Sequence, residues 1–166
     1  TNVNGAPTDL VLDGTVVNEN TPIGTQIGTF TVNDEDTADI HTLTLVAGAG
    51  DTGNSLVEID GVFLKTAENL DHETADSFSI RVRVTDNDAA VYEEAFVITV
   101  NDVNEPATAI LLDPSSVPEN ADGAIIGTLT VTDADAGDYR TRQGNVLTIK
   151  YFADWATTQK LYGVDC

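Results

Sequence analysis

The sequence contains an internal repeat. Residues 17–20 (VNEN) return as residues 117–120 (VPEN), and residues 27–36 (IGTFTVNDED) return as residues 126–135 (IGTLTVTDAD). The two pairs of segments are offset by 100 and 99 residues. This period exceeds the roughly 20–50 residues of a solenoid unit and matches the size of an independent domain. We therefore predict a slice of a tandem array, with one whole repeat followed by the start of a second.

The strong negative charge of the chain limits its partners. The sequence holds 28 Asp and Glu against 7 Lys and Arg, which gives a formal net charge of −21. Such a chain repels nucleic acids and anionic membrane surfaces. Hydrophobic residues still make up 41% of the sequence and fall in alternating runs, which favours folded domains over disorder.

Other features of the composition fit a module of an extracellular protein. The chain has one cysteine, Cys166, and therefore no disulfide framework. No apolar run approaches the roughly 18 residues of a membrane span, so we expect no direct membrane insertion in this segment. We expect a piece of a longer secreted or membrane-anchored protein. The absence of an Asn-x-Ser/Thr acceptor favours a bacterial source over a glycosylated animal ectodomain.

Alternating apolar and polar residues predict strands along the first repeat, and no segment shows sustained helical periodicity. The alternation is clearest from Phe78 to Val84, where every second residue is apolar. The predicted strands are Leu10–Val17 (split at Asp13-Gly14), Gln26–Val32, His41–Val46, Leu56–Ile59, Val62–Thr66, Ser77–Thr85 and Val91–Val100. Seven short strands separated by turns indicate an all-β, seven-stranded Greek-key β-sandwich with an immunoglobulin-like architecture, followed by an incomplete second repeat.

Acidic residues gather where these strands end. Because neighbouring strands in a sandwich run in opposite directions, the strand ends sort between two poles of the domain. The set expected at the C-terminal pole is Glu19, Asp71, Glu73 and Asp102. The set expected at the N-terminal pole is Asp34, Asp36 and Asp86. Clustered carboxylates repel one another, and Ca²⁺, which takes about 6–8 oxygen ligands, removes that repulsion.

These motifs resemble cadherin repeats, most closely the bacterial cadherin-like type, over residues 2–139. The matching segments are Asn18-Glu19-Asn20 and Pro118-Glu119-Asn120 (family Pro-Glu-Asn), Asp71-His72-Glu73 (Asp-Arg-Glu), Asp34-x-Asp36 and Asp133-x-Asp135 (Asp-x-Asp), Asp86, and Asp102-Val103-Asn104-Glu105-Pro106 (Asp-x-Asn-Asp-Asn). The linker departs from the family at Glu105 and Pro106. The resemblance implies a linker remnant at 1–8, a cadherin-like repeat at 9–101, a calcium-binding linker at 102–107, a partial second repeat at 108–139 and a non-matching tail at 140–166.

The resemblance also implies that Ca²⁺ binds between consecutive repeats. The ligands that it implies for the joint inside this chain are Glu19, Asp71, Glu73, Asp102, Asn104 and Glu105, together with Asp133 and Asp135. Asp34, Asp36 and Asp86 would belong to the joint with a preceding repeat, which we expect to be incomplete and weak without that repeat. Asp39, Asp88 and Asp138 are expected to be turn or solvent carboxylates.

The function implied is that of a calcium-binding module of a large extracellular or cell-surface protein, rather than an enzyme. Calcium would stiffen the array for cell adhesion. The expected partners are neighbouring repeats of the parent chain, the same protein on another cell, or surface glycans. The alternative is a carbohydrate-binding accessory module of a secreted polysaccharide-degrading enzyme. That alternative needs exposed aromatic residues, whereas those of the first repeat fall mostly at core-type positions.

The tail has a different composition from the rest of the chain. Residues 140–166 contain four basic residues against two acidic ones, as well as the only Trp of the chain, Trp155. One interpretation is an out-of-frame or foreign extension, which we favour, and the other is a divergent strand over Val146–Phe152 that pairs locally. An intact second sandwich is not expected in either case, because five of its strands are missing.

Overall fold

The computed structural model describes residues 4–113, 116, 123–135 and 146–150. The chain divides into two compact units, Thr1–Val103 and Asn104–Cys166, which we call the first and second units and describe separately. Within the described residues, no helix is long and apolar enough to cross a membrane.

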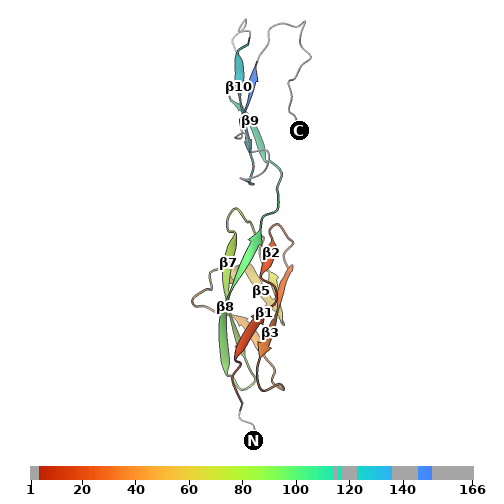
Figure 1. Cartoon of the computed structure of the whole chain (residues 1–166), viewed down its shortest axis with the longest axis vertical. Coiled ribbons are helices and arrows are strands. Elements are labelled where there is room, and N and C mark those ends of the chain that lie inside the picture. Colours follow the sequence, from red (N-terminus) through yellow and green to blue (C-terminus); the bar gives the residue numbers. More distant parts are fainter. Residues whose placement is uncertain (1–3, 114–115, 117–122, 136–145, 151–166) are drawn as a thin grey trace. The chain divides into compact units, whose positions relative to one another are not determined.

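The first unit is a sandwich of two four-stranded sheets (Figure 1). Its elements are β1 (Asp9–Leu12), β2 (Val16–Asn18), β3 (Gln26–Asn33), β4 (Thr42–Leu45), the 3₁₀ turn η1 (Asn54–Leu56), β5 (Val57–Asp60), β6 (Phe63–Thr66), β7 (Ser77–Thr85) and β8 (Val91–Asn101). One sheet has the order β1-β3-β6-β5 and the other has the order β2-β8-β7-β4. The predicted all-β sandwich is confirmed, and the observed strands begin and end close to the predicted positions.

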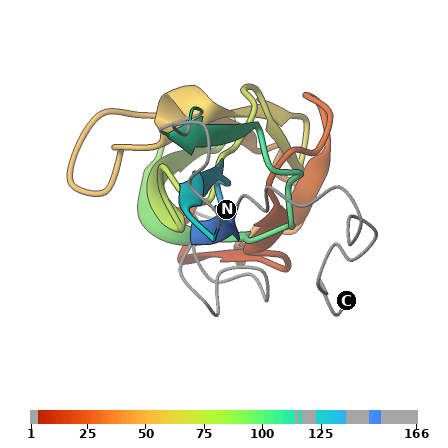
Figure 2. The same ribbon diagram turned by 90° about the horizontal axis from the view of Figure 1, so that it is seen from above.

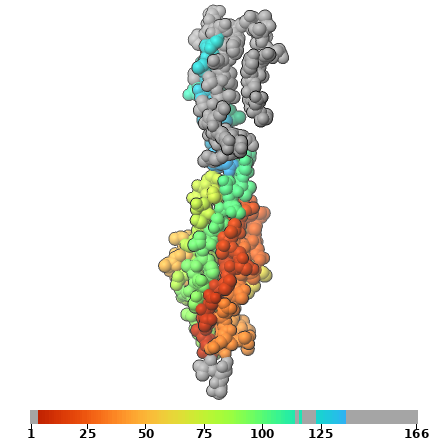
Figure 3. Space-filling view, in the orientation of Figure 1, coloured from red at the N-terminus to blue at the C-terminus, as the bar shows by residue number. Residues whose placement is uncertain are grey.

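The split in the first predicted strand lets the chain change sheets. β1 pairs antiparallel with β3, and β2 pairs parallel with β8. Figure 3 shows this N-terminal segment in red, between β8 in green and β3 in orange. The crossing requires glycine, because a Cβ atom on Gly28 would lie 2.5 Å from the carbonyl oxygen of Gly14. A side chain at either glycine would therefore force the two backbones apart.

The core of the first unit lies between the two sheets. In β7 the alternate residues Phe78, Ile80, Val82 and Val84 are buried, as their spacing predicts. The aromatic rings of Phe30 and Phe96 meet across the interface edge to face, with centroids 5.7 Å apart. Seen end-on in Figure 2, the strands of this unit surround that interior. Each sheet is thus anchored by apolar side chains, and the polar loops at the two ends remain available for other roles.

The second unit contains one sheet of three strands. Its strands are β9 (Ala109–Asp113), β10 (Ile125–Thr132) and β11 (Val146–Lys150), in the order β11-β10-β9. β9 and β10 pair in the register of β1 and β3: Leu112 lies opposite Leu129, as Leu12 lies opposite Phe30. The repeat seen in the sequence is therefore also a repeat of strand pairing.

β11 takes the place that β6 has in the first unit. Lys150 pairs with Ile125 and Ile149 with Gly127, as Lys65 pairs with Gln26 and Leu64 with Gly28. Both ladders have the same register shift at this point of the central strand. Of the two interpretations of the tail, local pairing is thus the one present over Val146–Lys150. Pro118-Glu119-Asn120, Asp138 and the chain after Lys150 lie outside the described residues.

Candidate metal centres at the ends of the sandwich

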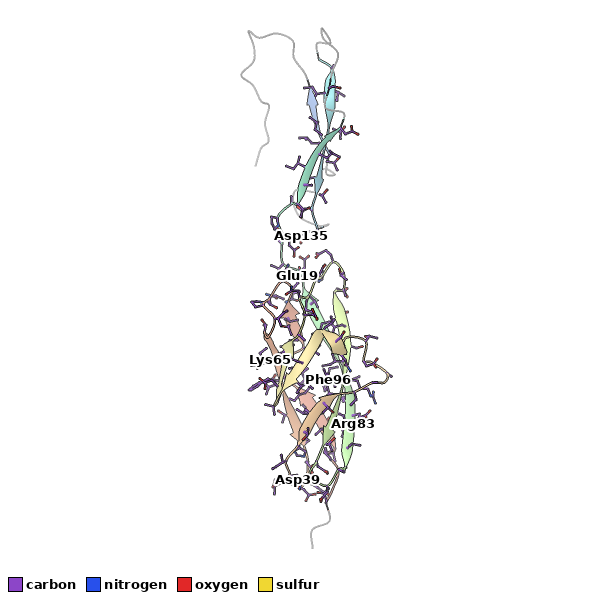
Figure 4. All side chains as sticks on the ribbon, turned by 180° about the vertical axis from the view of Figure 1, so that it is seen from behind. Glu19, Asp39, Lys65, Arg83, Phe96 and Asp135 are labelled. Carbon is purple, nitrogen blue, oxygen red and sulfur yellow. The ribbon has the colours of Figure 1, made fainter. Side chains whose placement is uncertain are left out.

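The N-terminal pole of the first unit brings three carboxylates together. Oxygen atoms of Asp34, Asp39 and Asp86 all lie within 4.8 Å of one another. Figure 4 labels Asp39 at this end of the first unit and Glu19 at the opposite end. Asp34 and Asp86 are two of the residues expected here, whereas Asp39 was expected to face solvent.

Asp86 is fixed by the turn that follows β7. Its Oδ1 accepts hydrogen bonds from the backbone N–H groups of Asp88 (2.9 Å) and Ala90 (2.8 Å), and its Oδ2 accepts one from the Asn4 side-chain amide (2.9 Å). The Asn4 hydrogen bond is the main cause that lowers the pKa of Asp86. Asp86 is only 6% exposed, and burial alone would raise its pKa, but these hydrogen bonds outweigh that effect and also orient the carboxylate.

The Asp34-x-Asp36 motif that follows β3 is oriented by three other donors. The His41 ring nitrogen Nε2 lies 2.8 Å from Asp34 Oδ2, and this contact is the main cause that lowers the pKa of Asp34. Asp34 Oδ1 accepts a hydrogen bond from the Asp36 N–H (3.0 Å). Asp36 Oδ2 accepts one from the Gly5 N–H (2.6 Å), which ties the N-terminal segment to the motif.

Asp39 is the member of this pole that the sequence motifs do not indicate. A backbone turn, in which the Asp39 N–H donates to the Asp36 carbonyl (3.0 Å), folds the residue back toward the motif. Burial is the main cause that raises the pKa of Asp39, and the negative charges of Asp36, Asp34 and Asp86 add to the effect. The nearest sequence signal was its position in the same loop as Asp34 and Asp36, but loop residues do not reveal which way the backbone turns.

At the C-terminal pole, Glu19 is the buried carboxylate, with 2% exposure. It follows β2, and its two oxygens accept hydrogen bonds from different parts of the chain. Oε2 accepts from the His72 N–H (2.6 Å) and Oε1 from the Val103 N–H (2.7 Å). Glu19 therefore joins the loop before β7 to the segment that follows β8.

Two further carboxylates approach one another at this pole. Glu73 has an oxygen within 4.8 Å of one from Glu19, and an oxygen within 4.8 Å of one from Asp102. Asp71 is engaged locally, because its oxygens accept from the Thr74 hydroxyl (2.9 Å) and the Thr74 N–H (3.0 Å). The hydrogen bonds from the Thr74 hydroxyl and from the Thr74 N–H are the main causes that lower the pKa of Asp71. Asp71 and Asp36 lie at the expected poles, but among the residues that the structure describes neither belongs to a set of three close carboxylates.

The second unit repeats the arrangement of the N-terminal pole. The Glu105 N–H donates to Asp135 Oδ2 at 2.6 Å, as the Gly5 N–H donates to Asp36 Oδ2. The Asn104 amide donates to the carbonyl of the next residue (2.9 Å), as the Asn4 amide does (3.1 Å). The Asp135 N–H contacts Asp133 Oδ1 at 3.4 Å. The Asp-x-Asp motif of each unit therefore holds the segment before its first strand by the same hydrogen bond.

The atoms that these groups offer to a metal ion are carboxylate oxygens, with side-chain amide groups nearby. Such sets suit hard cations, and Ca²⁺ tolerates their irregular geometry better than Mg²⁺ does. Zinc sites are built mainly on Cys and His, with Asp or Glu as additional ligands. The two histidines of the chain do not provide such a set: His41 lies against Asp34 at the N-terminal pole, and His72 Nδ1 lies 2.7 Å from the Val100 carbonyl oxygen at the other pole. The residues present therefore fit calcium.

Comparison with protein families decides the identity of this architecture. The model of the cadherin domain matches residues 14–101, which is more than half of the chain. The chain belongs to the cadherin family. Human Protocadherin-16 is 32% identical over 129 residues, a stretch that covers 73% of this chain and 4% of that protein. Human Protocadherin Fat 1 is 35% identical over 77 residues, covering 45% of this chain and 2% of that protein.

Solved cadherin structures share the fold. Human Protocadherin-24 EC1-2 aligns over 81% of this chain and 62% of that chain, with a TM-score of 0.62 and 21% identity. Cadherin domains 3-6 of Protocadherin Gamma B2 align over 87% of this chain and 38% of that chain, with a TM-score of 0.62 and 17% identity. The resemblance to cadherin repeats is thus confirmed, whereas the bacterial type and source stay a prediction. The chain is therefore a cadherin-type module, and it spans only a small part of the curated relatives that it matches.

One sequence argument against a carbohydrate-binding module needs correction. Phe63 was placed among mostly core-type aromatic positions, but its side chain is 39% exposed. Phe30 and Phe78 are buried, and Tyr92 and Phe96 are half-buried. Phe63 is thus the only aromatic residue among those five that is classed as exposed, and one exposed ring does not form the stacking platform that sugar binding usually needs.

Proposed function

We propose that this cadherin domain is a calcium-binding module of a large extracellular or cell-surface adhesion protein. The observation that carries the proposal is the approach of Asp34, Asp39 and Asp86 to within 4.8 Å at one pole, with only oxygen ligands on offer. Three ionised carboxylates at this separation repel one another strongly without a cation. The fixed orientation of Asp34 and Asp86 supports a binding role over a merely solvated surface.

The proposed ligands form three groups, each considered within its own unit. Asp34, Asp36 and Asp86 belong to the N-terminal pole of the first unit, where Asp39 lies close to Asp34 and Asp86. Glu19, Asp71, Glu73 and Asp102 belong to its C-terminal pole. Asn104, Glu105, Asp133 and Asp135 belong to the second unit. Calcium would neutralise each group, and the loops that carry the ligands would become stiffer as a result.

The proposed role in adhesion follows from the family and not from the charge alone. Relatives such as Protocadherin-16 are many times longer than this chain. The matched stretch covers only 4% of Protocadherin-16. The proposed partners are neighbouring cadherin repeats of the parent chain, and a second copy of the protein or a surface glycan on another cell. In this proposal calcium acts mechanically: it holds the strand ends in one conformation, so that the sandwich presents a constant surface.

The test is a calcium titration of the full chain by isothermal calorimetry. Wild type should release or take up heat with a dissociation constant of about 10⁻⁴–10⁻³ M, the range of extracellular calcium modules. Asp86→Asn should lose part of the binding, because it removes one charge from a pre-oriented group. Asp51→Asn is the matched control, because Asp51 lies in a loop and accepts a hydrogen bond from the Gly48 N–H. The proposal is wrong if wild type binds no calcium.

A further inference from the structure

We propose that Asn4 is a site of spontaneous deamidation, that hydrogen bonds of the folded first unit restrain the reaction, and that its product releases the N-terminal segment. Of the asparagines in the sequence, only Asn4 is followed by glycine. Glycine at the next position favours deamidation, because it has no Cβ atom to hinder attack by its own nitrogen. The inference goes beyond the proposed function, because the reaction needs no cation.

The reaction uses only the Asn4-Gly5 dipeptide and water. The backbone nitrogen of Gly5 gives up its proton and forms a bond with the Asn4 side-chain carbon Cγ. The Cγ–Nδ2 bond breaks, and Nδ2 leaves with that proton as ammonia, so that a cyclic imide remains. Water then opens the ring at either carbonyl carbon. Cleavage of the new Cγ–N bond gives aspartate, and cleavage of the original peptide bond gives isoaspartate, in which the chain continues through the side chain.

Hydrogen bonds of the folded unit hold both reacting groups. The Gly5 N–H donates to Asp36 Oδ2 (2.6 Å), and the negative charge of that carboxylate disfavours loss of the proton that the attack requires. The Asn4 Nδ2 donates to Asp86 Oδ2 (2.9 Å) and to the Gly5 carbonyl (3.1 Å). Because Nδ2 is the leaving atom, both of these bonds must break. The folded state therefore slows the reaction, which proceeds when the segment opens locally.

Either product undoes the attachment of the segment. An aspartate replaces the amide donor with a carboxylate that faces Asp86, and Asp86 is only 6% exposed, so two negative charges repel at short range. An isoaspartate adds a backbone atom between residues 4 and 5, which moves the next N–H away from Asp36. Pro7 is buried, so the chain is held again from that residue on. Deamidation therefore releases residues 4–6 irreversibly and leaves β1 in place.

The second unit contains a matched asparagine. The Asn104 amide donates to the Glu105 carbonyl (2.9 Å), and the Glu105 N–H donates to Asp135 Oδ2 (2.6 Å), as in the dipeptide at positions 4 and 5. Here glutamate follows the asparagine, and its side chain hinders attack by its own nitrogen. Asn104 should therefore stay intact under conditions in which Asn4 reacts.

The experiment incubates the full chain in EDTA at mildly alkaline pH, and peptide mapping by mass spectrometry follows each asparagine over time. EDTA keeps calcium out, so the outcome does not depend on the proposed function. In wild type, Asn4 should react severalfold faster than Asn104. The rate at Asn4 should rise about tenfold or more in concentrated urea, since the charge-assisted hydrogen bond to Asp36 is absent there. Equal rates at the two asparagines, or a rate at Asn4 that urea leaves unchanged, would overturn the inference.

Two variants separate the restraint from the intrinsic reactivity. Asp36→Ala removes the acceptor of the Gly5 N–H and should speed deamidation of the folded chain about tenfold. Gly5→Ala should slow deamidation severalfold both with and without urea. Its Cβ atom would lie 2.7 Å from Glu35 Oε1, at the far end of a flexible side chain that can move aside. If Asp36→Ala reacts at the wild-type rate, the restraint is wrong.

Two controls identify general effects. Asp51→Ala removes a carboxylate that accepts a hydrogen bond from the Gly48 N–H, and it should not change the rate at Asn4. Asn54 precedes the small residue Ser55 and is held in the fold, where its amide donates to the Val46 carbonyl (2.9 Å). Faster reaction at Asn54 would therefore reveal global unfolding of a variant, and the comparison of wild type with and without urea then decides the restraint.

Asn4→Asp tests the release, because it makes the direct product in every molecule. Amide hydrogen exchange at Gly5 should become about tenfold faster or more than in wild type, since its hydrogen bond to Asp36 is lost. Exchange at Thr8 should keep its rate, because the Thr8 N–H donates to the Asn33 carbonyl (2.9 Å) in the adjoining strand. Unchanged exchange at Gly5 would show that the product stays attached, and the inference would be wrong.

Discussion

Ala89 adopts a backbone conformation that L-residues rarely use, with φ of 69°. It lies in the turn whose N–H groups from Asp88 and Ala90 hold Asp86 in place. The left-handed conformation costs a non-glycine residue about 1–2 kcal/mol, and a glycine at this position would avoid that cost. Part of the benefit is lost, because glycine loses more conformational entropy on folding than alanine does. We expect Ala89→Gly to stabilise the first unit by roughly 0.5–1 kcal/mol without changing calcium affinity. Urea denaturation measures the stability, and a destabilised variant would contradict the expectation.

Glu73 and Glu58 allow a matched test of the C-terminal pole. Glu73 has oxygens near those of Glu19 and Asp102, whereas Glu58 is exposed in the short strand β5. We expect Glu73→Ala to weaken calcium binding severalfold and Glu58→Ala to leave it unchanged. Titration calorimetry compares the two variants. Equal affinities would show that the C-terminal group is not a calcium site.

Glu93 connects stability to pH. It pairs with Arg81 (2.9 Å) and Arg83 (2.6 Å), and these arginines, Arg83 first, hold its pKa below the ordinary value of 4.5. Because the pKa of Glu93 is lower in the folded state, the ion pairs contribute their full stabilisation at a pH above the ordinary pKa. This stabilisation is lost as the pH falls through the lower, folded-state pKa. Wild type should therefore be more stable than Glu93→Gln near neutral pH, and the difference should shrink in acid. Thermal melts between about pH 3 and 7 measure it, with the exposed Glu68→Gln as the control.

Motifs with fixed spacing indicated where some acidic residues lie in the fold, while their role as calcium ligands stays a prediction. Asp34 and Asp86 are far apart in the sequence, but each follows a strand, and adjacent strand ends meet in a sandwich. Asp39 was missed because its place depends on a turn and on Asn87, and neither leaves a periodic signal. Its pKa is raised first by burial and then by the neighbouring carboxylates, and only the folded chain supplies either.

At the scale of elements, alternation located the strands but not all of their partners. β7 alternates so regularly that its buried face could be named from the sequence. The parallel pairing of β2 with β8 could not be predicted from the sequence. It joins segments about 80 residues apart, and the local pattern of β2 spans only three residues. The place of β11 beside β10 was also hidden, since its sequence does not match the first repeat while its register does.

The second unit should be less stable than the first, because its sheet lacks a partner layer among the described residues. Ile110 is 70% exposed, whereas Leu10, at the equivalent position of the first repeat, is 1% exposed. A side chain of this size contributes about 1.5–3 kcal/mol when it is fully buried. We expect amide hydrogen exchange in β10 and β11 to be much faster than in β7. Protection of Val146–Lys150 equal to that of Ser77–Thr85 would contradict this expectation.

At the scale of the whole molecule, calcium should raise the melting temperature. The net charge of −21 makes the folded chain repel itself, and bound cations reduce that repulsion. At ten times the dissociation constant, one ion contributes about 1.4 kcal/mol, which corresponds to roughly 5–10 °C for a domain of about 100 residues. Calorimetric scans in EDTA and in about 10 mM Ca²⁺ measure the shift. Sodium chloride at matched ionic strength is the control for simple screening, and an equal shift in the salt control would contradict specific binding.

The hydrogen bond that fastens each linker to its Asp-x-Asp motif uses the backbone N–H of residue 5 or residue 105. Because the side chain takes no part in that bond, the attachment is the same with glycine at position 5 and glutamate at position 105. A single substitution can therefore change the charge at this position without altering that bond, although at position 5 the Glu35 side chain must move, because a Cβ atom there would lie 2.7 Å from Glu35 Oε1. If the proposed calcium binding holds, the residue at this position tunes the charge of each linker independently of the strands that carry it.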